Sequence, residues 1–359
     1  MATRELVPTL SPVRLRAATW SDTDFQSPTR SWCCAREIEA SLRVRRCYGG
    51  RVKRSGVNAD VLTPTAAAGW SGSVWPLFVH LRLHYQLVFL SPLFAWGFAL
   101  GGGEFSRRAG WGFLSFHVFL YGGITAYNSY YDRDEGPVGG LLKPPSVTPP
   151  LLGFSLAVQA LGLALAALVG WELAALYATV MVLSVAYSHP RFRWKARPLL
   201  SLLVVALGQG AVGFRAGWLC AATPPLPLLS SSEGLLGMAA AVLLTTGFYP
   251  LSQLYQIAED RQRGDLTFAV AYGPKASFRF SLTCLVAGGL CIALVVLARF
   301  GLRDALVAFS AQLLLWWVVL RWHRNFQNEV MGNFVTLHRL QLAVSAGTLG
   351  YVSFRLLLS

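Results

Sequence analysis

Long apolar runs, separated by short polar or Gly/Pro-rich links, organise the chain after residue 73. Several runs reach about 18 residues with almost no charge, the length that an α-helix needs to cross the hydrocarbon core of a bilayer. Small residues inside them, as in GQGAVG at 208–213, are typical of helices that pack closely in lipid. The pattern predicts an all-α integral membrane protein with about nine transmembrane helices, near residues 83–101, 111–131, 151–170, 172–188, 199–220, 234–257, 280–300, 303–321 and 339–358.

The composition agrees with this pattern. Hydrophobic residues make up 54% of the 359 residues, charged residues only 13%, and the mean hydropathy is +0.47. A soluble protein of this size needs roughly 25% charged residues to cover its surface. The composition therefore excludes an ordinary soluble domain.

Residues 1–73 differ from the rest of the chain. They hold the basic runs RVRR and RVKR and the cysteines Cys33, Cys34 and Cys47, but no apolar core, so we expect a disordered basic extension before a membrane domain at 74–359. No apolar stretch follows the basic residues as in a secretory signal, and no paired His/Cys ligands follow at zinc-like spacing. The extension fits a basic arm on anionic lipid, a targeting segment, or sequence upstream of a wrongly assigned start; we favour the last.

The links between the predicted helices differ in charge. If the N-terminus is cytoplasmic, four arginines lie in the outer links, namely Arg107, Arg108, Arg299 and Arg303. Thirteen basic residues then lie in the inner links: Arg133, Lys143, Arg191, Arg193, Lys195, Arg197, Arg261, Arg263, Lys275, Arg279, Arg321, Arg324 and Arg339. This bias predicts a cytoplasmic N-terminus and an outer C-terminus. It explains the positive charge without nucleic-acid binding.

Acidic residues concentrate in two short stretches. Of the eleven acids after residue 73, three lie in AYNSYYDRDEGP at 126–137 and three in YQIAEDRQRGDLT at 255–267. Four predicted helices separate the stretches, so both lie on the cytoplasmic face, each at the end of a helix. Carboxylates gathered from separate segments repel each other unless a cation lies among them, and clustered oxygen ligands suit Mg²⁺ shared with phosphate.

Basic residues alternate with these acids, and RFRWKAR at 191–197 adds more. This mixture favours a metal-bridged diphosphate whose other oxygens bind Arg and Lys. A helical bundle behind it would hold a long apolar tail. Together these features are typical of polyprenyl transfer. A solvated loop would explain either stretch alone, and an intramembrane ion path would place its acids in the middle of helices.

At these residues the sequence resembles the UbiA superfamily of intramembrane prenyltransferases, over about residues 78–358. In the family's first motif, Asn-x3-Asp-x3-Asp, Asn128 and Asp132 match and Gly136 stands at the third position. In the second motif, Asp260, Gly264 and Thr267 match, and Gln256 stands where an earlier Asp is expected. The segment AYSHPRFRWKARP at 186–198 is similar to the family's Tyr-Ser-x-Pro link. These departures indicate a divergent subgroup.

The resemblance implies Mg²⁺-dependent prenyl transfer from a polyprenyl diphosphate to an aromatic quinone precursor or a related lipid-pathway molecule. Asp132 and Asp260 would be the catalytic carboxylates, and the metal ligands would be Asn128, Asp132, Asp134 and Glu135 for one ion and Asp260 with Gln256, Glu259 or Asp265 for another. The diphosphate contacts would be Arg82, Arg133, Lys143, Arg191, Arg193, Lys195 and Arg263. Side chains lining the substrate or facing the carbocation would be Tyr127, Tyr131, Tyr187 and Tyr255, which also fit an interfacial aromatic belt.

Two other functions stay open. The missing motif acids also fit a catalytically degenerate homologue, and a lipid- or ion-handling membrane protein without chemistry is the third class. Magnesium-dependent release of diphosphate distinguishes the enzyme from both.

Overall fold

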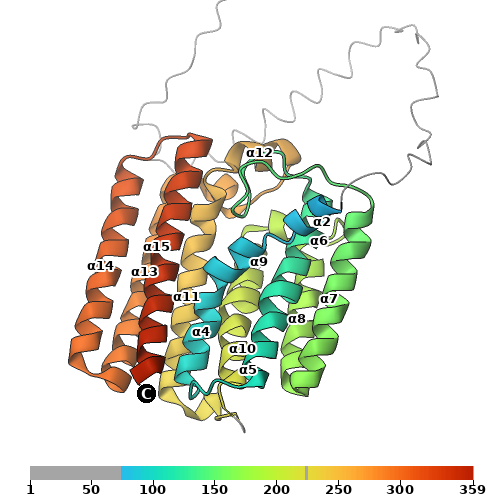
Figure 1. Cartoon of the computed structure of the whole chain (residues 1–359). Coiled ribbons are helices and arrows are strands. Elements are labelled where there is room, and N and C mark those ends of the chain that lie inside the picture. Colours follow the sequence, from blue (N-terminus) through green and yellow to red (C-terminus); the bar gives the residue numbers. More distant parts are fainter. Residues whose placement is uncertain (1–73, 223–224, 359) are drawn as a thin grey trace, which may run out of the picture. The chain divides into compact units, whose positions relative to one another are not determined.

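The computed structural model describes residues 74–222 and 225–358, so the predicted extension at 1–73 lies outside the described residues. The described residues are helical apart from their connections, and they contain one isolated β-bridge, between Val138 and Leu141. The α-helices are α2 Trp75–Val79, α3 Leu83–Tyr85, α4 Ser91–Leu100, α5 Arg107–Leu114, α6 Gly122–Asp132, α7 Pro150–Val169, α8 Trp171–Ser188, α9 Pro198–Val205, α10 Val212–Cys220, α11 Ser232–Gln253, α12 Ile257–Arg263, α13 Phe268–Phe300, α14 Leu302–Arg324 and α15 Val330–Leu358 (Figure 1).

Seven helical segments of the described chain are long and apolar enough to cross a membrane. They are Trp75–Leu100, Pro150–Val169, Trp171–Ser188, Pro198–Cys220, Ser232–Gln253, Phe268–Phe300 and Leu302–Arg324. The protein is therefore an all-α polytopic membrane protein, as the sequence predicts. The segments 107–132 and 330–358 are also helical but less apolar, so the count of nine stays a prediction.

Several helices have other bounds than the apolar pattern predicts. Helix α13 begins at Phe268 rather than 280, because Gly273 and Pro274 separate its first turn from the long apolar run. Helix α15 begins at Val330 rather than 339, because Asn333 and His338 interrupt the apolar pattern there. Gly273, with φ of 78°, and Pro274 bend α13 within that extension. The predicted helix 234–257 ends at Gln253, and the second acidic stretch forms a helix of its own, α12.

Three helices widen into π-helical turns. These are η2 Gln86–Leu90 before α4, η3 Ser115–Tyr121 between α5 and α6, and η5 Ala206–Ala211 between α9 and α10. The Tyr121 hydroxyl in η3 donates a 3.1 Å hydrogen bond to the Gly208 carbonyl in η5. Such turns are frequent at functional sites because they leave backbone carbonyls free and displace the side chains.

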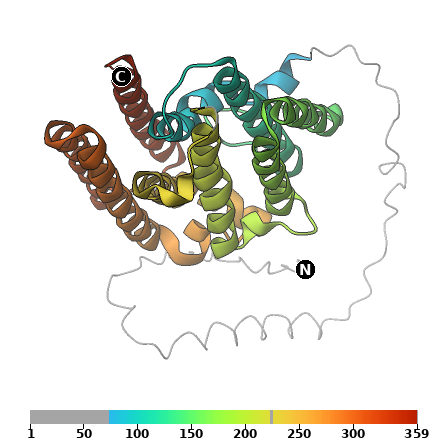
Figure 2. The ribbon, with the colours of Figure 1, turned by 90° about the horizontal axis from the view of Figure 1, so that it is seen from below.

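The long helices run side by side, with α13 and α14 on one side, α7 and α8 on the other, and α10 and α11 between them (Figures 1 and 2). Helices α4 and α10 approach closely. A Cβ atom at Gly97 or Gly217 would overlap the backbone of Phe214 or Phe94 on the facing helix. In the run 208–213, a Cβ atom at Gly210 would lie 2.8 Å from Val242 Cα on α11, so the small residues there also allow close packing.

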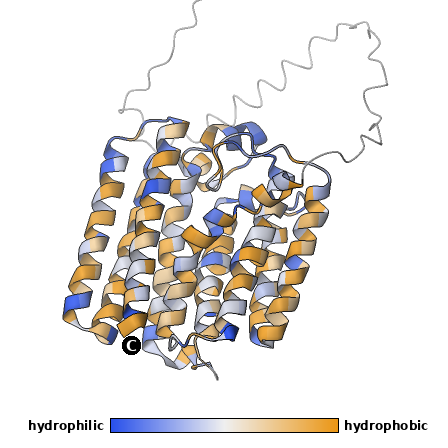
Figure 3. Ribbon diagram, in the orientation of Figure 1, coloured by the Kyte–Doolittle hydropathy of each residue, from blue (hydrophilic) through white to orange (hydrophobic). Residues whose placement is uncertain are grey.

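Polar residues gather at one end of the bundle, where α12 and the segment 133–149 lie, and we call this the polar end (Figure 3). The C-terminus lies at the opposite end (Figure 1). Three non-glycine residues of the described chain have positive φ, namely Arg82, Arg133 and Arg193, at 49°, 51° and 41°. Each adjoins a helix end, and such backbone strain concentrates at functional sites.

Candidate active site

The first acidic segment begins at the end of α6. Asn128 and Asp132 are one helical turn apart and therefore share a face. The Asn128 side-chain amide donates to Asp132 Oδ2 at 2.7 Å and to Ser188 Oγ on α8 at 3.1 Å. Arg133, in the left-handed conformation, ends the helix, so that Asp134 lies in the following loop. Two carboxylates are thereby presented at the polar end.

The second acidic segment is α12 and the turn after it. Gly264, with φ of 77°, ends α12, and the Asp265 backbone N–H donates to the Asp260 carbonyl at 2.9 Å. The Thr267 hydroxyl donates to Asp260 Oδ2 at 3.0 Å. This tight turn holds both aspartates on the same side of the segment.

Basic side chains join the two acidic segments. Arg263 Nη1 donates to Asp134 Oδ1 at 2.5 Å, and its Nη2 donates to Asp260 Oδ1 at 3.0 Å. The Lys195 ammonium forms ion pairs with Asp132 and Asp265. The contact between Arg263 and Asp134 joins the two segments directly, across 129 positions of the chain.

Two further arginines complete the cluster. Arg193 forms a bidentate pair with Asp265, with N–O distances of 2.7 and 2.9 Å. Arg82 Nη2 donates to Ser129 Oγ at 2.9 Å and lies 3.9 Å from Asp134 Oδ2. Gly139, with φ of 47°, lies against the Arg82 guanidinium, where a Cβ atom would collide with it.

The four aspartates are buried, with side-chain exposures of 6% for Asp132, 4% for Asp134, 7% for Asp260 and 2% for Asp265. Buried carboxylates are rare unless they are paired. Burial raises the pKa of Asp260 above its ordinary value, although the hydrogen bond and charge of Arg263 oppose the shift. Burial lowers the pKa of Arg263, but the hydrogen bond and charge of Asp134, with Glu259 and Asp132, outweigh it and raise that pKa. The arginine is therefore a fixed positive charge.

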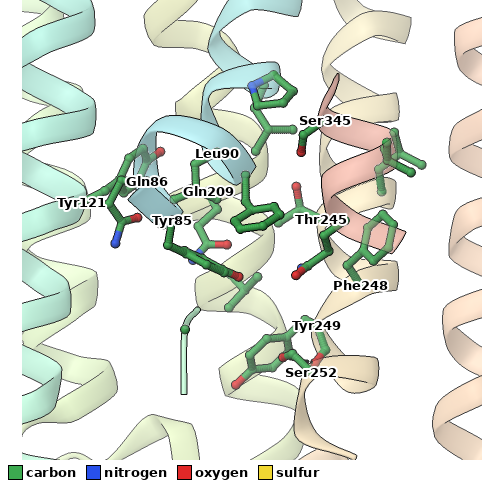
Figure 4. Close-up of a pocket in the computed structure, with 18 of the residues that line it drawn as sticks. Tyr85, Gln86, Leu90, Tyr121, Gln209, Thr245, Phe248, Tyr249, Ser252 and Ser345 are labelled. Atoms are coloured by element: carbon green, nitrogen blue, oxygen red, sulfur yellow. Dashed lines mark hydrogen bonds between the residues drawn. The ribbon is translucent and has the colours of Figure 1, made fainter. Parts of the chain in front are cut away.

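The four aspartates line part of a cavity of about 760 Å³ that also reaches into the bundle. Figure 4 shows lining residues of its interior, among them Gln209 and Tyr249. Its walls are mostly apolar, and residues of all three π-helical segments line it. Tyr187 on α8 and Tyr249 on α11 line the cavity, and their hydroxyls are hydrogen-bonded at 2.8 Å. The cavity thus combines a charged mouth with an apolar interior, which suits an amphipathic ligand.

The structure brings most of the predicted site residues to this cavity. Those that line it are Arg82, Asn128, Asp132, Asp134, Tyr187, Lys195, Tyr255, Gln256, Asp260, Arg263 and Asp265. Glu259 and Arg193 do not line it but contact the cluster, Glu259 through Arg263 at 3.6 Å. The two acidic segments therefore form one site.

Other predicted site residues lie away from the cavity. Arg133, Glu135, Lys143 and Arg191 are exposed. Tyr127 packs against Tyr131, and Tyr131 against His189, with ring centroids 5.0 and 5.4 Å apart. These rings belong to the contact between α6 and the link after α8. The predicted roles of these residues remain predictions.

The predicted division of the carboxylates between two metal ions remains a prediction. In the described part of the chain, no group of three or more His, Cys, Asp or Glu side chains is arranged as a metal site. Lys195 and Arg263 lie between the carboxylates instead. The donors are nevertheless oxygens, as Mg²⁺ prefers. Asp134 Oδ2, whose nearest cation is Arg82 at 3.9 Å, makes the Asp132–Asp134 side the best fit for one ion.

Sequence reasoning missed several residues of the site. Tyr249 and Ser129 contact the predicted residues but hold no motif position, and Ser188, the Ser of the Tyr-Ser-x-Pro link, was not named as a site residue. Tyr249 lies about one turn before the end of an apolar helix that leads into the acidic segment, and this position is the one signal that points to it. Arg263 was one candidate among seven for diphosphate contacts, whereas in the structure it contacts acids of both segments.

Comparisons with known proteins agree with this architecture. The family model described as the UbiA prenyltransferase family matches residues 89–337. None of the curated proteins matches the chain.

Among solved structures, the chain is similar to a UbiA homologue from Archaeoglobus fulgidus bound to DMAPP and Mg²⁺, with a TM-score of 0.58 and 22% identity over 78% of this chain and 99% of that one. The same homologue bound to GPP and Mg²⁺ gives a TM-score of 0.57 and 21% identity, over 77% and 99%. A UbiA homologue from Aeropyrum pernix K1 gives 0.55 and 23%, over 75% and 97%. At these identities the likeness shows the shared fold.

Proposed function

Because the chain belongs to the UbiA prenyltransferase family, we propose that it transfers a prenyl group from a prenyl diphosphate to an acceptor within the membrane. The observation that carries the proposal is the meeting of both acidic segments and three basic side chains at the mouth of one apolar cavity. The Archaeoglobus homologue, with the same fold, was solved with DMAPP or GPP and Mg²⁺. These ligands have the charged head and apolar tail that this cavity suits.

Different residues of the chain would bind the diphosphate head and the prenyl tail of the donor. Lys195, Arg263 and Arg82 would bind the diphosphate oxygens by charge-assisted hydrogen bonds. Asp132 and Asp134 would hold Mg²⁺, with Asp260 facing them from α12. When bound, Mg²⁺ neutralises the negative charge that develops on the leaving diphosphate.

The aromatic and apolar lining would protect the prenyl group. Tyr187, Tyr249 and Tyr255 lie between the charged mouth and the apolar interior, where their ring faces can stabilise positive charge on an allylic carbon. Phe89 and Phe248 contribute to the apolar interior, which excludes water that would otherwise capture the carbocation.

For the acceptor we propose an aromatic quinone precursor or a related lipid-pathway molecule. Gln209 and Thr245 are among the polar side chains that line the mostly apolar cavity, and they support an acceptor with hydroxyl or carbonyl substituents (Figure 4). We place the polar end at the cytoplasmic face, because the basic residues of the links concentrate there.

A catalytically degenerate homologue is the second candidate. The observation that favours it is the pairing of the acidic groups with Lys and Arg, which leaves few carboxylate oxygens for metal. The two candidates differ in one measurable property, the metal-dependent release of diphosphate.

The test is diphosphate release by the full chain in nanodiscs, across prenyl diphosphates of increasing length, with and without Mg²⁺. We expect diphosphate release only when Mg²⁺ is present. In Asp132→Asn and Asp260→Asn the rate of release should fall at least about 100-fold, because each substitution removes a negative charge from the site. Glu104→Gln is the matched control, since Glu104 is exposed in the link before α5. Full activity in both aspartate variants would show that the site is wrongly assigned, and no release with any donor would favour the degenerate homologue.

A further inference from the structure

Arg263 occupies the centre of the acidic cluster. Its guanidinium contacts Asp134 from the first segment and Asp260 from the second, and it lies 3.6 Å from Glu259 and 3.9 Å from Asp265. Its Nη1 also donates to the Asp132 carbonyl at 3.3 Å. No other basic side chain in the described residues is paired with so many acids of the site. Arg263 therefore occupies the position between two carboxylate groups that a bridging cation would need.

The cluster is close to neutral without any ion. Four buried aspartates and the half-buried Glu259 face Arg82, Lys195, Arg263 and Arg193. Five carboxylates against four cationic side chains leave about one negative charge, which a single divalent cation is enough to offset.

Two neutral residues stand at motif positions where the family resemblance leads us to expect acids. Gln256, at the start of α12, lines the cavity with an amide in place of a charge. Gly136 lies against Glu259, whose Oε2 would be 3.1 Å from a Cβ atom at that position. Glu259 Oε1 accepts a 3.3 Å hydrogen bond from the Glu135 backbone N–H, so this carboxylate is held at the loop and pairs with Arg263.

We propose that Arg263 replaces one metal ion of the diphosphate site, so that this chain binds its donor with a single divalent cation on the Asp132–Asp134 side. The inference rests on the proposed function, whose diphosphate site it specifies. A guanidinium can link carboxylates to phosphate oxygens as a bridging cation does, through two parallel hydrogen bonds. Unlike a metal ion, it is part of the chain and is always present.

The test counts metal ions rather than turnover. The full chain in nanodiscs is incubated with Mn²⁺ and inorganic diphosphate, and both are measured in the retained fraction after ultrafiltration. We expect one retained Mn²⁺ per retained diphosphate for the native chain. In Arg263→Gln the ratio should rise towards two, because the carboxylates of Asp134 and Asp260 become free to bind metal.

Two control variants make the result interpretable. Arg261→Gln removes the same charge from an exposed position of α12 and should keep the ratio at one. Arg263→Lys keeps the charge but loses the bidentate geometry, so the ratio should stay at one while diphosphate binds at least about fivefold more weakly. This variant keeps the inference testable if Arg263→Gln fails to fold.

The outcomes separate this inference from the proposed function. A ratio of two in the native chain overturns the inference, as does an unchanged ratio in folded Arg263→Gln or a native chain that retains no diphosphate. A ratio of one without diphosphate release from any prenyl donor would leave the role of Arg263 intact and contradict the prenyl transfer. Release of diphosphate together with a metal ratio of two would support prenyl transfer and contradict the role of Arg263.

Discussion

Each buried aspartate at the polar end has a basic partner, and Lys195 is the partner that two of them share. Its ammonium contacts Asp132 and Asp265, and its side chain is only 8% exposed. Lys195 follows Arg193, whose left-handed backbone turns the link after α8 towards the cavity. A single side chain of the link after α8 therefore contacts both Asp132 at the end of α6 and Asp265 in the turn after α12.

Replacement of this lysine tests that coupling. We expect Lys195→Gln to lower kcat/KM for the prenyl diphosphate about 100-fold, because a cation that faces the diphosphate is lost. Diphosphate release at varied donor concentration measures the effect. Arg197→Gln is the control, since Arg197 is exposed two residues further on. Equal activity of the two variants would contradict a role for Lys195 in donor binding.

At the scale of elements, short irregular segments position the site. Helix α12 spans Ile257–Arg263 and ends at Gly264. This short helix and the turn after it place both Asp260 and Asp265 in the cavity wall. The π-helical turns η2, η3 and η5 bring Gln86, Tyr121 and Gln209 to the same cavity. Irregular backbone at these points shapes the cavity, while the long regular helices cross the membrane.

The turn at Gly264 gives a prediction at this scale. A Cβ atom there would meet no other atom within 4 Å, so Gly264→Ala should be unfavourable only because its φ of 77° strains an L-residue. We expect a loss of about 1 kcal/mol in stability and a weaker diphosphate release, because Asp265 shifts. Thermal unfolding in detergent and the release assay measure both effects.

Gly153→Ala is the matched control. Gly153 lies inside α7, and a Cβ atom there also meets nothing within 4 Å, but its backbone is helical. Alanine should therefore be neutral or stabilising at this position. If both alanine variants behave alike, the left-handed turn has no special role in the site.

At the scale of the whole molecule, the charged cluster ties distant helices together without help from an ion. Because Lys and Arg neutralise the acids internally, we expect EDTA to shift the unfolding temperature of the purified chain by less than about 2 °C. Mg²⁺ together with diphosphate should raise it, since ligands that bind only the folded state stabilise it. Differential scanning fluorimetry measures both shifts. A large loss of stability in EDTA would show that a metal is structural.

Much of this architecture follows from the sequence, and the reasons differ between elements. The apolar runs at 150–169, 171–188 and 198–220 are predicted within one or two residues, because each is a nearly uninterrupted apolar stretch that both lipid contact and burial favour. Helix α12 was not predicted, because seven mostly polar residues have no apolar period to reveal them. Its helical form depends on packing that no local pattern records.

The candidate site was predictable as a pair of acidic stretches on one face. The ion pairs between its acidic and basic side chains were not predictable. Which base faces which acid depends on helices that are far apart in the chain, as for Arg263 and Asp134. The exposure of Lys143 and Arg191 could not be read from sequence either, because a basic residue at a helix end serves equally well as a topology signal.

The internal neutrality of the cluster has a consequence for how this protein can evolve. Loss of Asp134 would remove the acid that Arg82 faces at 3.9 Å, and loss of Arg263 would leave Asp260 without its 3.0 Å ion pair. Substitutions at these positions should therefore be accepted in pairs. Relatives in which Arg263 has been replaced are expected to carry a carboxylate at the position of Gly136 or Gln256. Over evolution, an arginine would then be exchanged for a bound metal ion together with the acidic ligand that it needs.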